Sequence, residues 1–582
     1  MMSNRRPPSR RHLWPWVLLA CGLNGLALPA MAQVSRILPD QRPSDERLPP
    51  PPLNDLAPPA VVPILPPFPI PEDAEADGSS PDQQVEVHKI EISGNTVVPS
   101  EVLQAIAQPY EGRRLSHTDL QKLRDRLTLA YIERGYATSG ATIPSQRTKN
   151  GVLQVRIIEG KLDDIRVEVD GRFRPGYFRW RIAHSQQGVL NVPRLQEQLQ
   201  LFQQDPQIET IQARLEATAT RGVSRLLLSV REAPFYSLGA DFDNYRSPAI
   251  GSFGGTANAG LKNLIGVGDA FWARFTGSEG LRQVEARFEV PFTVWDTRFG
   301  VRYQYSEGDV VDGLFESLGI ESEATSVGFT LSQPLYRSLR SNIGVRLHAD
   351  WRVAQSFLFD GAIGLPTRYD EDGKSQEFVL RLGFDASYRT RSQSLQIRSL
   401  LSYGIDALGA TINSGSVPDG RFFSWLGQFQ WAIRLPWLDA QILNRFDVQL
   451  SPDPLLPLEQ YAIGGRYTVR GYRENTLVRD EGLNASVELR IPVFEQLEPP
   501  VLIELAPFAE LGRSWNNNRG DGALETTDPE TIASVGVGVR VHLPHQIYGE
   551  LYWGHRLKEI EDLGDSDLQD DGIAFRLGIA WP

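Results

Sequence analysis

The sequence predicts a mainly β protein: a sixteen-stranded antiparallel transmembrane β-barrel preceded by two small periplasmic β-α-α-β-β domains. Three observations predict this architecture. The chain begins with a secretory signal, residues 83–233 repeat one order of strands and helices, and residues 234–582 alternate apolar and polar side chains in strand-length runs. Spanning strands need only about 9–11 residues with every second one apolar, so they coexist with ordinary overall hydropathy.

Residues 1–32 predict a signal peptide. An apolar stretch over residues 13–28 is followed by small residues at Ala30-Met31-Ala32, a suitable cleavage site. Its positive end holds Arg5, Arg6, Arg10 and Arg11. Two alternatives stay open. Residues 18–21 resemble a lipoprotein cleavage box, although Leu19 is large for that site. Residues 9–13 resemble a twin-arginine signal, which carries folded proteins, whereas a membrane barrel crosses unfolded.

Removal of the signal changes the chemistry of the mature chain. Cys21 is the single cysteine, so the mature chain has no thiol, no disulfide and no cysteine-bound metal. The full chain has 59 basic and 72 acidic residues. Losing four arginines and no acids leaves 55 against 72, a net charge of −17. This balance argues against a nucleic-acid partner.

Residues 33–82 predict a proline-rich linker. Fourteen prolines lie between Pro39 and Pro81. Proline lacks a backbone N–H and favours extended polyproline II, so this stretch is expected to be a semi-rigid spacer. A partner-docking or wall-spanning role is the alternative.

The segments 83–160 and 161–233 predict two domains of similar order. In the first, an alternating strand at 85–92 precedes a short helix at 100–107 and a longer helix that begins at Ser116, followed by strands at 137–144 and 151–158. In the second, a strand at 162–169, a helix at 192–203 and strands at 207–217 and 224–230 follow. The order β-α-α-β-β is expected twice.

Residues 234–582 predict the barrel through sixteen strand-like runs. Their approximate spans are 235–245, 255–265, 269–279, 281–292, 297–308, 322–332, 341–357, 374–390, 392–405, 421–436, 438–452, 482–493, 501–515, 531–543, 546–557 and 571–582. In one of them, Val284, Ala286 and Phe288 alternate with Glu285 and Arg287. Short gaps mostly follow even-numbered strands and long gaps mostly follow odd-numbered ones. Outer-membrane barrels combine short periplasmic turns, longer external loops and an even strand count, and an even count returns the C-terminus to the periplasmic side.

Known catalytic and metal motifs give no support to an enzyme. Gly373-Lys374-Ser375 lacks the earlier glycine of a phosphate-binding loop, and neither a His-Glu-x-x-His helix nor a Gly-x-Ser-x-Gly elbow occurs. Four aspartates within residues 565–571 form a solvated loop cluster, with weak calcium binding as the alternative. We therefore expect no catalytic residue, no metal and no cofactor.

The run at residues 131–165 resembles the first polypeptide-transport-associated (POTRA) repeat of two-partner secretion transporters, the haemolysin secretion/activation type. The residues that carry this resemblance are Tyr131, Gly135, Tyr136, Thr138, Ser139, Pro144, Gly151, Leu153, Glu159 and Gly160. Gly140 departs from the pattern, because an arginine is frequent there. The glycines are also plausible turn formers on their own.

The run GGRYTVRGYREN at residues 464–475 carries the second part of the resemblance. Transporters of this kind, and related barrel-assembly insertases, have Val-Arg-Gly-Tyr in the loop after the eleventh strand. The matching loop residues are Gly464, Gly465, Val469, Arg470, Gly471 and Tyr472. The resemblance implies that the loop, about 453–481, folds into the barrel. Its arginine would meet an aromatic-x-acid-x-Gly motif on the thirteenth strand, here Phe508, Glu510 and Gly512, with Glu where Asp is common.

The resemblance implies an outer-membrane pore of a diderm bacterium with its POTRA domains in the periplasm. The implied cargo is an unfolded, β-rich exoprotein that is exported without ATP. Implied partners are that exoprotein, outer-membrane lipid and the barrel-assembly machinery during biogenesis. The chain ends Trp581-Pro582, whereas related barrels commonly end on an aromatic residue. An outer-membrane β-barrel assembly factor is the main alternative; a diffusion porin lacks periplasmic repeats, and a barrel hydrolase would need catalytic residues.

Overall fold

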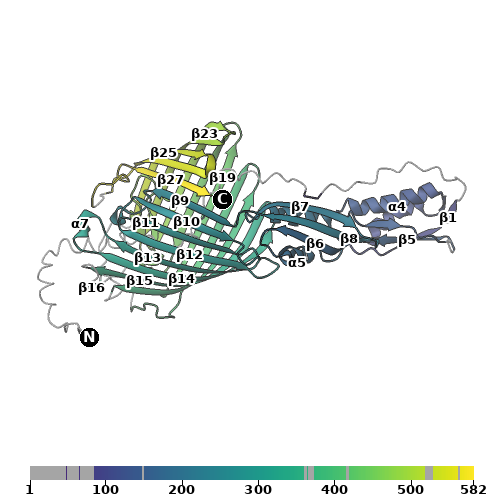
Figure 1. Ribbon diagram of the computed structural model, residues 1–582, viewed down its shortest axis with the longest axis horizontal. Coiled ribbons are helices and arrows are strands. Elements are labelled where there is room, and N and C mark those ends of the chain that lie inside the picture. The colour runs from purple at the N-terminus through teal and green to yellow at the C-terminus, as the bar shows by residue number, and fades with distance from the viewer. Residues whose placement is uncertain are drawn as a thin grey trace.

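The structure, a computed structural model, describes residues 48, 64–65, 84–146, 150–358, 363–364, 373–414, 418–517, 529–560 and 564–581. The predicted signal peptide, most of the predicted linker and Pro582 lie outside these residues. Figure 1 shows a barrel with two smaller domains extending in a row from one of its ends.

The first small domain packs two helices against a sheet of order β2-β5-β4. Its elements are β1 (Val85–Val87), β2 (Lys89–Ser93), α3 (Ser100–Ala107), η1 (Gln108–Tyr110), β3 (Arg113–Leu115), α4 (His117–Ile132), β4 (Gly140–Thr142) and β5 (Val152–Ile158). Leu123, Leu127 and Tyr131 of α4 are fully buried. Their spacing of four residues places them on one face of the helix.

The predicted strand 85–92 is two strands in the structure. The backbone bends at His88, whose N–H donates to the carbonyl oxygen of Gly151 at 2.7 Å. The segment before the bend, β1, therefore pairs with β3, while β2 pairs in parallel with β5. The strand predicted at 137–144 is also shorter, since β4 covers three residues.

The second small domain repeats this order with β6 (Lys161–Asp170), α5 (Pro175–Ser185), α6 (Val192–Gln203), β7 (Ile208–Ala217) and β8 (Val223–Glu232). Helix α5 was not located from the sequence, because its aromatic residues are adjacent rather than periodic. Phe173, Tyr177 and Phe178 cluster in the core of this domain. Leu65, a linker residue, packs into the same core, and its N–H donates to Gln196 Oε1 at 2.9 Å.

The predicted barrel is confirmed: sixteen long antiparallel strands in the described ranges close into one sheet. They are β9 (Tyr236–Asp243), β10 (Gly254–Lys262), β11 (Ala270–Ser278), β12 (Leu281–Pro291), β13 (Arg298–Asp309), β14 (Glu321–Arg337), β15 (Ser341–Leu358), β17 (Lys374–Arg389), β18 (Gln393–Gly404), β19 (Phe423–Leu435), β20 (Ala440–Leu450), β23 (Glu481–Gln496), β24 (Val501–Trp515), β25 (Glu530–Leu543), β26 (Ile547–Arg556) and β27 (Ile573–Trp581). A two-residue strand, β16 (Ile363–Gly364), pairs with the end of β15. Short connecting helices are η2 (Pro248–Ile250), α7 (Gly313–Glu316) and η4 (Pro544–Gln546).

Alternation along the strands separates an apolar outer surface from a polar lumen. On β12, Val284 is 44% exposed whereas the adjacent Glu285 is 3% exposed. Other large apolar side chains on the exposed outer surface include Phe275, Phe329, Leu382, Leu511 and Trp553. An outward apolar band around a polar interior is the arrangement of outer-membrane barrels. None of the helices in the described part of the chain is long and apolar enough to cross a bilayer.

The barrel closes where β27 pairs with β9 from Leu238↔Trp581 to Asp243↔Arg576. The side chain of Asn244 extends this seam by imitating a peptide group. Its Nδ2 donates to the Ile573 carbonyl at 2.9 Å, and its Oδ1 accepts from the Phe575 N–H at 2.8 Å.

The second small domain is attached to the barrel through two short turns. Arg174 N–H donates to the carbonyl of Gly266, in the β10–β11 turn, at 2.8 Å. Arg181 of α5 donates to the carbonyl of Thr293, in the β12–β13 turn, at 3.1 Å. These short turns therefore lie at the end of the barrel that faces the small domains, as Figure 1 shows.

Candidate functional site

The chain between β20 and β23 lies inside the barrel and is called the lumen loop here (residues 451–480). It contains η3 (Pro457–Glu459) and a small hairpin of β21 (Tyr461–Ile463) and β22 (Leu477–Arg479). Leu455, Ile463 and Val469 are fully buried. The apolar residues of the loop thus form a core within an otherwise polar lumen.

Arg470, at the tip of the loop, contacts Glu510 on β24. One carboxylate oxygen, Oε1, accepts from Arg470 Nε at 2.9 Å and from Nη2 at 2.6 Å. The other, Oε2, accepts from the backbone N–H of Arg470 at 2.6 Å. Glu510 therefore binds both the side chain and the backbone of this residue, and the additional methylene of Glu spans the distance. Ser486 Oγ donates a further hydrogen bond to Oε1 at 2.9 Å.

Glu488 on β23 is a second carboxylate partner that was not identified from the sequence. It accepts from Arg470 Nη1 at 2.6 Å and from Arg490 Nε at 2.6 Å. The guanidinium of Arg470 also lies 3.6 Å above the ring of Phe508 and 4.6 Å from that of Tyr552. Two carboxylates and two aromatic faces suit a planar, permanently charged guanidinium, which would be costly to bury without them.

Glycines at the tip permit contacts that a side chain would block. A Cβ on Gly471, which has φ +92°, would lie 2.8 Å from the carbonyl oxygen of Gly554 on β26. A Cβ on Gly554 would lie 2.8 Å from the Gly471 nitrogen. The loop and the barrel wall therefore meet backbone to backbone here. Gly512, in the aromatic-x-acid-x-Gly motif, leaves the space that Ile463 and Val469 fill.

The other predicted loop residues lie around this tip. Tyr472 Oη donates to the carbonyls of Ala533 (3.0 Å) and Lys558 (2.8 Å). Gly464 and Gly465 have positive φ, and a Cβ on either would meet atoms of the returning strand of the loop. All the residues named from the resemblance for the loop and the wall thus lie in one cluster.

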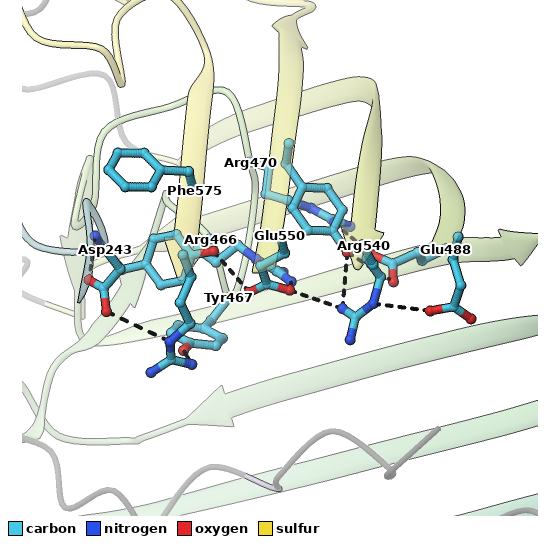
Figure 2. Close-up of polar contacts among 12 residues, drawn as sticks. Asp243, Arg466, Tyr467, Arg470, Glu488, Arg540, Glu550 and Phe575 are labelled. Atoms are coloured by element: carbon cyan, nitrogen blue, oxygen red, sulfur yellow. Dashed lines mark hydrogen bonds and ion pairs between the residues drawn. The ribbon is translucent and has the colours of Figure 1, made fainter. Parts of the chain in front are cut away.

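A second arginine of the loop extends the charge network along the wall. Arg466 Nη2 donates to Glu550 on β26 at 2.9 Å, and Arg540 on β25 donates to the same carboxylate at 3.0 Å (Figure 2). Arg473 donates to Asp570, in the last long connection, at 2.5 and 2.7 Å. Asp570 belongs to the aspartate cluster considered for calcium. No group of three or more metal-binding side chains occurs within the ranges that the structure describes.

The base of the loop is held on a different part of the barrel. The Glu459 carboxylate accepts from Arg352 Nη1 on β15 at 2.8 Å and from Arg381 on β17. All three side chains are at least 90% buried. The loop thus leaves the wall at β20 and is bound both to β15–β17 and to β23–β26, so it bridges the lumen.

The predicted POTRA residues lie at the joint between the two small domains. The carbonyl of Gly135 accepts from Val192 N–H at 2.9 Å, and that of Gly160 accepts from Leu190 N–H at 2.7 Å. A Cβ on Gly135 would lie 2.9 Å from the Pro193 ring. Ser139 Oγ accepts from the Gly160 N–H at 2.9 Å.

Tyr131 and Glu159 form a clasp beneath this joint. Tyr131 Oη donates to Glu159 at 2.9 Å, and the same carboxylate accepts from the N–H groups of Thr96 and Val97 at 2.6 and 3.0 Å. Burial and this hydrogen bond raise the pKa of Tyr131. Burial alone would raise the pKa of Glu159, but the donated hydrogen bonds outweigh it and lower that pKa. Tyr136 packs edge-on against Tyr131, 6.2 Å between ring centres.

Pro144 and Thr138 of the predicted POTRA signature lie outside both the clasp and the hydrogen bonds of the joint described above. Pro144 is exposed after β4. Thr138 lies against Gly160, where a Cβ would be 2.2 Å from its Oγ1.

Two family models match this chain. The model described as "Haemolysin secretion/activation protein ShlB/FhaC/HecB" matches residues 222–541, and "POTRA domain, ShlB-type" matches residues 85–160. Similar curated proteins include the outer membrane transporter CdiB of Escherichia coli O6:K15:H31 (strain 536 / UPEC), 25% identical over 68% of this chain and 67% of the relative. The heme/hemopexin transporter protein HuxB of Haemophilus influenzae (strain 86-028NP) is 22% identical over 76% of this chain and 78% of the relative.

Solved structures with a similar fold include CdiB from Escherichia coli, with a TM-score of 0.65 at 19% identity, covering 88% of this chain and 94% of that one. BamA from Haemophilus ducreyi lacking POTRA domains 1–3 has a TM-score of 0.54 at 13% identity, covering 86% of this chain and 100% of that one. At these identities the likeness describes the fold alone.

Proposed function

Because the chain belongs to the haemolysin secretion/activation family ShlB/FhaC/HecB, an outer-membrane family of POTRA-plus-barrel proteins, we propose that it is a two-partner secretion pore. It exports one unfolded, β-rich exoprotein from the periplasm to the cell surface. The observation that carries the proposal is the lumen loop, which bridges the barrel, is bound to its wall by ion pairs and packing, and forms no strand of the barrel sheet. Residues 83–160 and 161–233 act as its two POTRA domains, and residues 234–582 as the pore.

The POTRA domains face the mouth of the barrel and present open sheet edges. β2 and β4 flank the first sheet, and β6 and β7 flank the second. An extended exoprotein segment can add to such an edge as a further strand, since its backbone groups complete the ladder. The short turns then lead it toward the lumen.

Export needs no nucleotide in this proposal. The sequence has no phosphate-binding loop, and the POTRA domains lie in the periplasm. Folding of the exoprotein outside the cell would bias its movement outward. The apolar outer surface of the barrel contacts outer-membrane lipid, and the barrel-assembly machinery inserts the chain during biogenesis.

Arg470 has a conformational role and carries out no chemistry. It holds the lumen loop in its resting position through Glu510 and Glu488. Removing one partner of a buried ion pair costs about 3–5 kcal/mol, because the remaining charge is left without compensation. Without Arg470 the loop loses its defined resting place while the sheet of the barrel stays paired.

The test is release of a co-expressed candidate exoprotein, in cells that carry wild type, Arg470→Ala or Arg434→Ala. Arg434 pairs with Asp439 in an exposed periplasmic turn, so it is a control for loss of an arginine elsewhere on the barrel. We expect cargo in the medium for wild type and for the control, and at most a tenth of it for Arg470→Ala, with equal amounts of heat-modifiable barrel.

Normal release by Arg470→Ala contradicts the role of the loop. If deletion of the gene leaves cargo release unchanged and instead depletes other outer-membrane barrels, the chain is a β-barrel assembly factor.

A further inference from the structure

One face of the lumen is rich in arginine. Strand register places seven arginines of β13, β15, β17 and β18 on the same face of the sheet, because directly paired residues share a face. Arg389 is the last residue of β17. The other six are called the arginine track here: Arg298, Arg302, Arg346, Arg352, Arg381 and Arg398. The described lumen face of β13–β18 carries three carboxylates within these pairings: Asp350, Glu377 and Asp385.

Two carboxylates of the wall are each shared by two arginines of the track. Asp350 accepts from Arg302 at 2.6 Å and from Arg381 at 2.8 Å. Asp385 accepts from Arg346 at 2.7 Å through both of its oxygens and from Arg398 at 2.8 Å. Each of these acids is therefore divided between two arginines, which leaves the face with excess positive charge.

The track begins in a cavity of about 480 Å³ at the periplasmic mouth, lined among others by Arg298, Arg337, Arg346, Asp385 and Arg398. At the mouth, as on the wall, one carboxylate is shared by several arginines. Asp296 lies 3.3 Å from Arg298, 3.2 Å from Arg337 and 3.6 Å from Arg181 of α5.

Leu48, which belongs to the predicted proline-rich linker (residues 33–82), also lines this cavity. A side chain of this stretch thus forms part of the lining at the start of the track.

The inner end of the track is where the lumen loop supplies its own carboxylate. Glu459 accepts from Arg352 and Arg381, which belong to the wall. A guanidinium fork matches a carboxylate wherever that carboxylate comes from, so an incoming acidic side chain can replace Glu459 on the same two arginines.

We propose that the arginine track binds the Asp and Glu side chains of the exoprotein as it enters, and that Glu459 is the resting occupant of its inner end. Carboxylates advancing from the mouth displace Glu459 and free the base of the loop. This inference rests on the proposed function, because it names the substrate chemistry of that pore. The track faces the lumen, which favours a polypeptide over membrane lipid.

Binding of labelled oligoglutamate to the purified full chain in phosphatidylcholine nanodiscs, followed by fluorescence anisotropy, tests the proposal directly. Arg337→Gln removes an exposed charge at the mouth. The triple variant Arg346→Gln/Asp385→Asn/Arg398→Gln removes the middle of the track without leaving a buried acid unpaired. Arg434→Gln, on the periplasmic rim but outside the track, is the matched control.

We expect oligoglutamate to bind the wild type, and oligolysine of equal length not to bind. The dissociation constant should rise about threefold for Arg337→Gln, as for one exposed charge, and about tenfold for the triple variant, as for charge-assisted pairs. Glu459→Gln should lower it about threefold, because the resident competitor loses its charge. Asp439→Asn, an acid outside the track, should leave it unchanged.

Equal binding of oligolysine, equal loss with Arg434→Gln, or no gain with Glu459→Gln overturns the proposal. An effect of Arg337→Gln that occurs only when phosphatidylglycerol is added assigns the arginines to lipid instead. The binding assay contains no exoprotein, so it can fail independently of secretion. If oligoglutamate does not bind but the chain still secretes, only the arginine track is refuted. If oligoglutamate binds but the chain secretes nothing, the proposed secretion function is refuted.

Discussion

The lumen loop is bound by two parts of the barrel wall that present opposite charges to it. On β23–β26 the wall supplies the acids, and Arg470 of the loop lies between Glu510 and Glu488. On β15 and β17 the wall supplies Arg352 and Arg381, and Glu459 belongs to the loop. If the tip lay on β15–β17, or the base on β23–β26, each would meet side chains of its own charge. The opposite charges of the two wall regions therefore fix which part of the loop binds to each.

The two attachments also differ in how closely the backbones approach. At the tip, Gly471 and Gly554 let the loop and β26 touch directly, and the Arg470 side chain is stacked on aromatic rings as well as ion-paired. At the base, Glu459 reaches the wall through its carboxylate. The tip thus combines close backbone contact, ring stacking and ion pairs. The base combines the ion pairs of Glu459 with a hydrogen bond from Gln449 to the Glu459 carbonyl at 2.8 Å and packing of Leu455 against Val379 and Phe422.

Glu510→Ala gives the largest expected effect, because it removes the acceptor of four hydrogen bonds at the tip. Exoprotein in the medium should fall at least tenfold, in line with the cost of an unpaired buried arginine. Asp439→Ala, whose carboxylate pairs with the exposed Arg434 in the β19–β20 turn, is the control and should secrete within about twofold of wild type. Equal loss in both variants would show that loss of any acid, rather than loss of the tip contact, lowers secretion.

Gly554→Ala should have the next largest effect, because the new methyl group lies within 3 Å of the Gly471 backbone and lifts the tip without removing any charge. We expect secretion to fall about fivefold, because the added methyl group should weaken binding of the loop tip to the barrel wall by about 1 kcal/mol. Gly549→Ala on the same strand is the control, because a Cβ there would lie nearest to the end of the flexible Leu577 side chain. Quantitative immunoblotting of the medium measures both, and matched secretion by the two variants would show that close approach is unimportant.

Glu159→Gln extends the comparison outside the barrel, to a carboxylate held by N–H and O–H donors. The pKa of Glu159 is lowered in the folded protein. Its contribution to stability is therefore present above the unfolded pKa of about 4.3 and is lost as the pH falls through the lower folded value. Protection of the amides of residues 94–99, taken relative to the intrinsic exchange rate at each pH, should fall on acidification in the wild type. In Glu159→Gln this protection should depend less on pH and be about threefold lower at neutral pH. An unchanged pH profile in the variant would remove Glu159 as its cause.

Ser116→Ala should have the smallest effect. Ser116 caps α4 and exchanges hydrogen bonds with Asp119, at 3.2 Å from the Asp119 N–H and 2.9 Å to its carboxylate. Loss of such a cap costs about 1 kcal/mol. Hydrogen exchange in the first turn of α4 should rise about fivefold with secretion unchanged, and a loss of secretion would show that the POTRA helices are more sensitive than the barrel.

The strands of the barrel could be predicted because their signal is local. Each has its own alternation, and the sequence-based ends mostly agree with the structure to within about two residues, as at β24, where both give 501–515. Helix α5 could not be located, because its buried side chains follow the shape of one small core rather than a period. The bend at His88 depends on Gly151, far along the chain.

The candidate site divides in the same way. Arg470 and Glu510 carry a resemblance that can be read in two short runs. Glu488, Gly554 and Glu459 carry none. An acid or a glycine on an alternating strand looks like any other lumen-facing residue, and Glu459 lies in the short helix η3 outside the two recognised runs. Only the closed sheet shows that Gly554 lies opposite Gly471, or that Glu459 reaches across to β15 and β17.

Asp296 has a consequence beyond charge balance. Its carboxylate is shared between Arg181 of a POTRA helix and Arg298 and Arg337 of the barrel mouth. On the same two elements, Trp295 Nε1 donates to His184 Nε2 at 2.9 Å. The β12–β13 turn therefore ties the second small domain to the barrel rim through one carboxylate and one indole hydrogen bond. The orientation of that domain and the charge balance of the rim arginines are set by the same short turn.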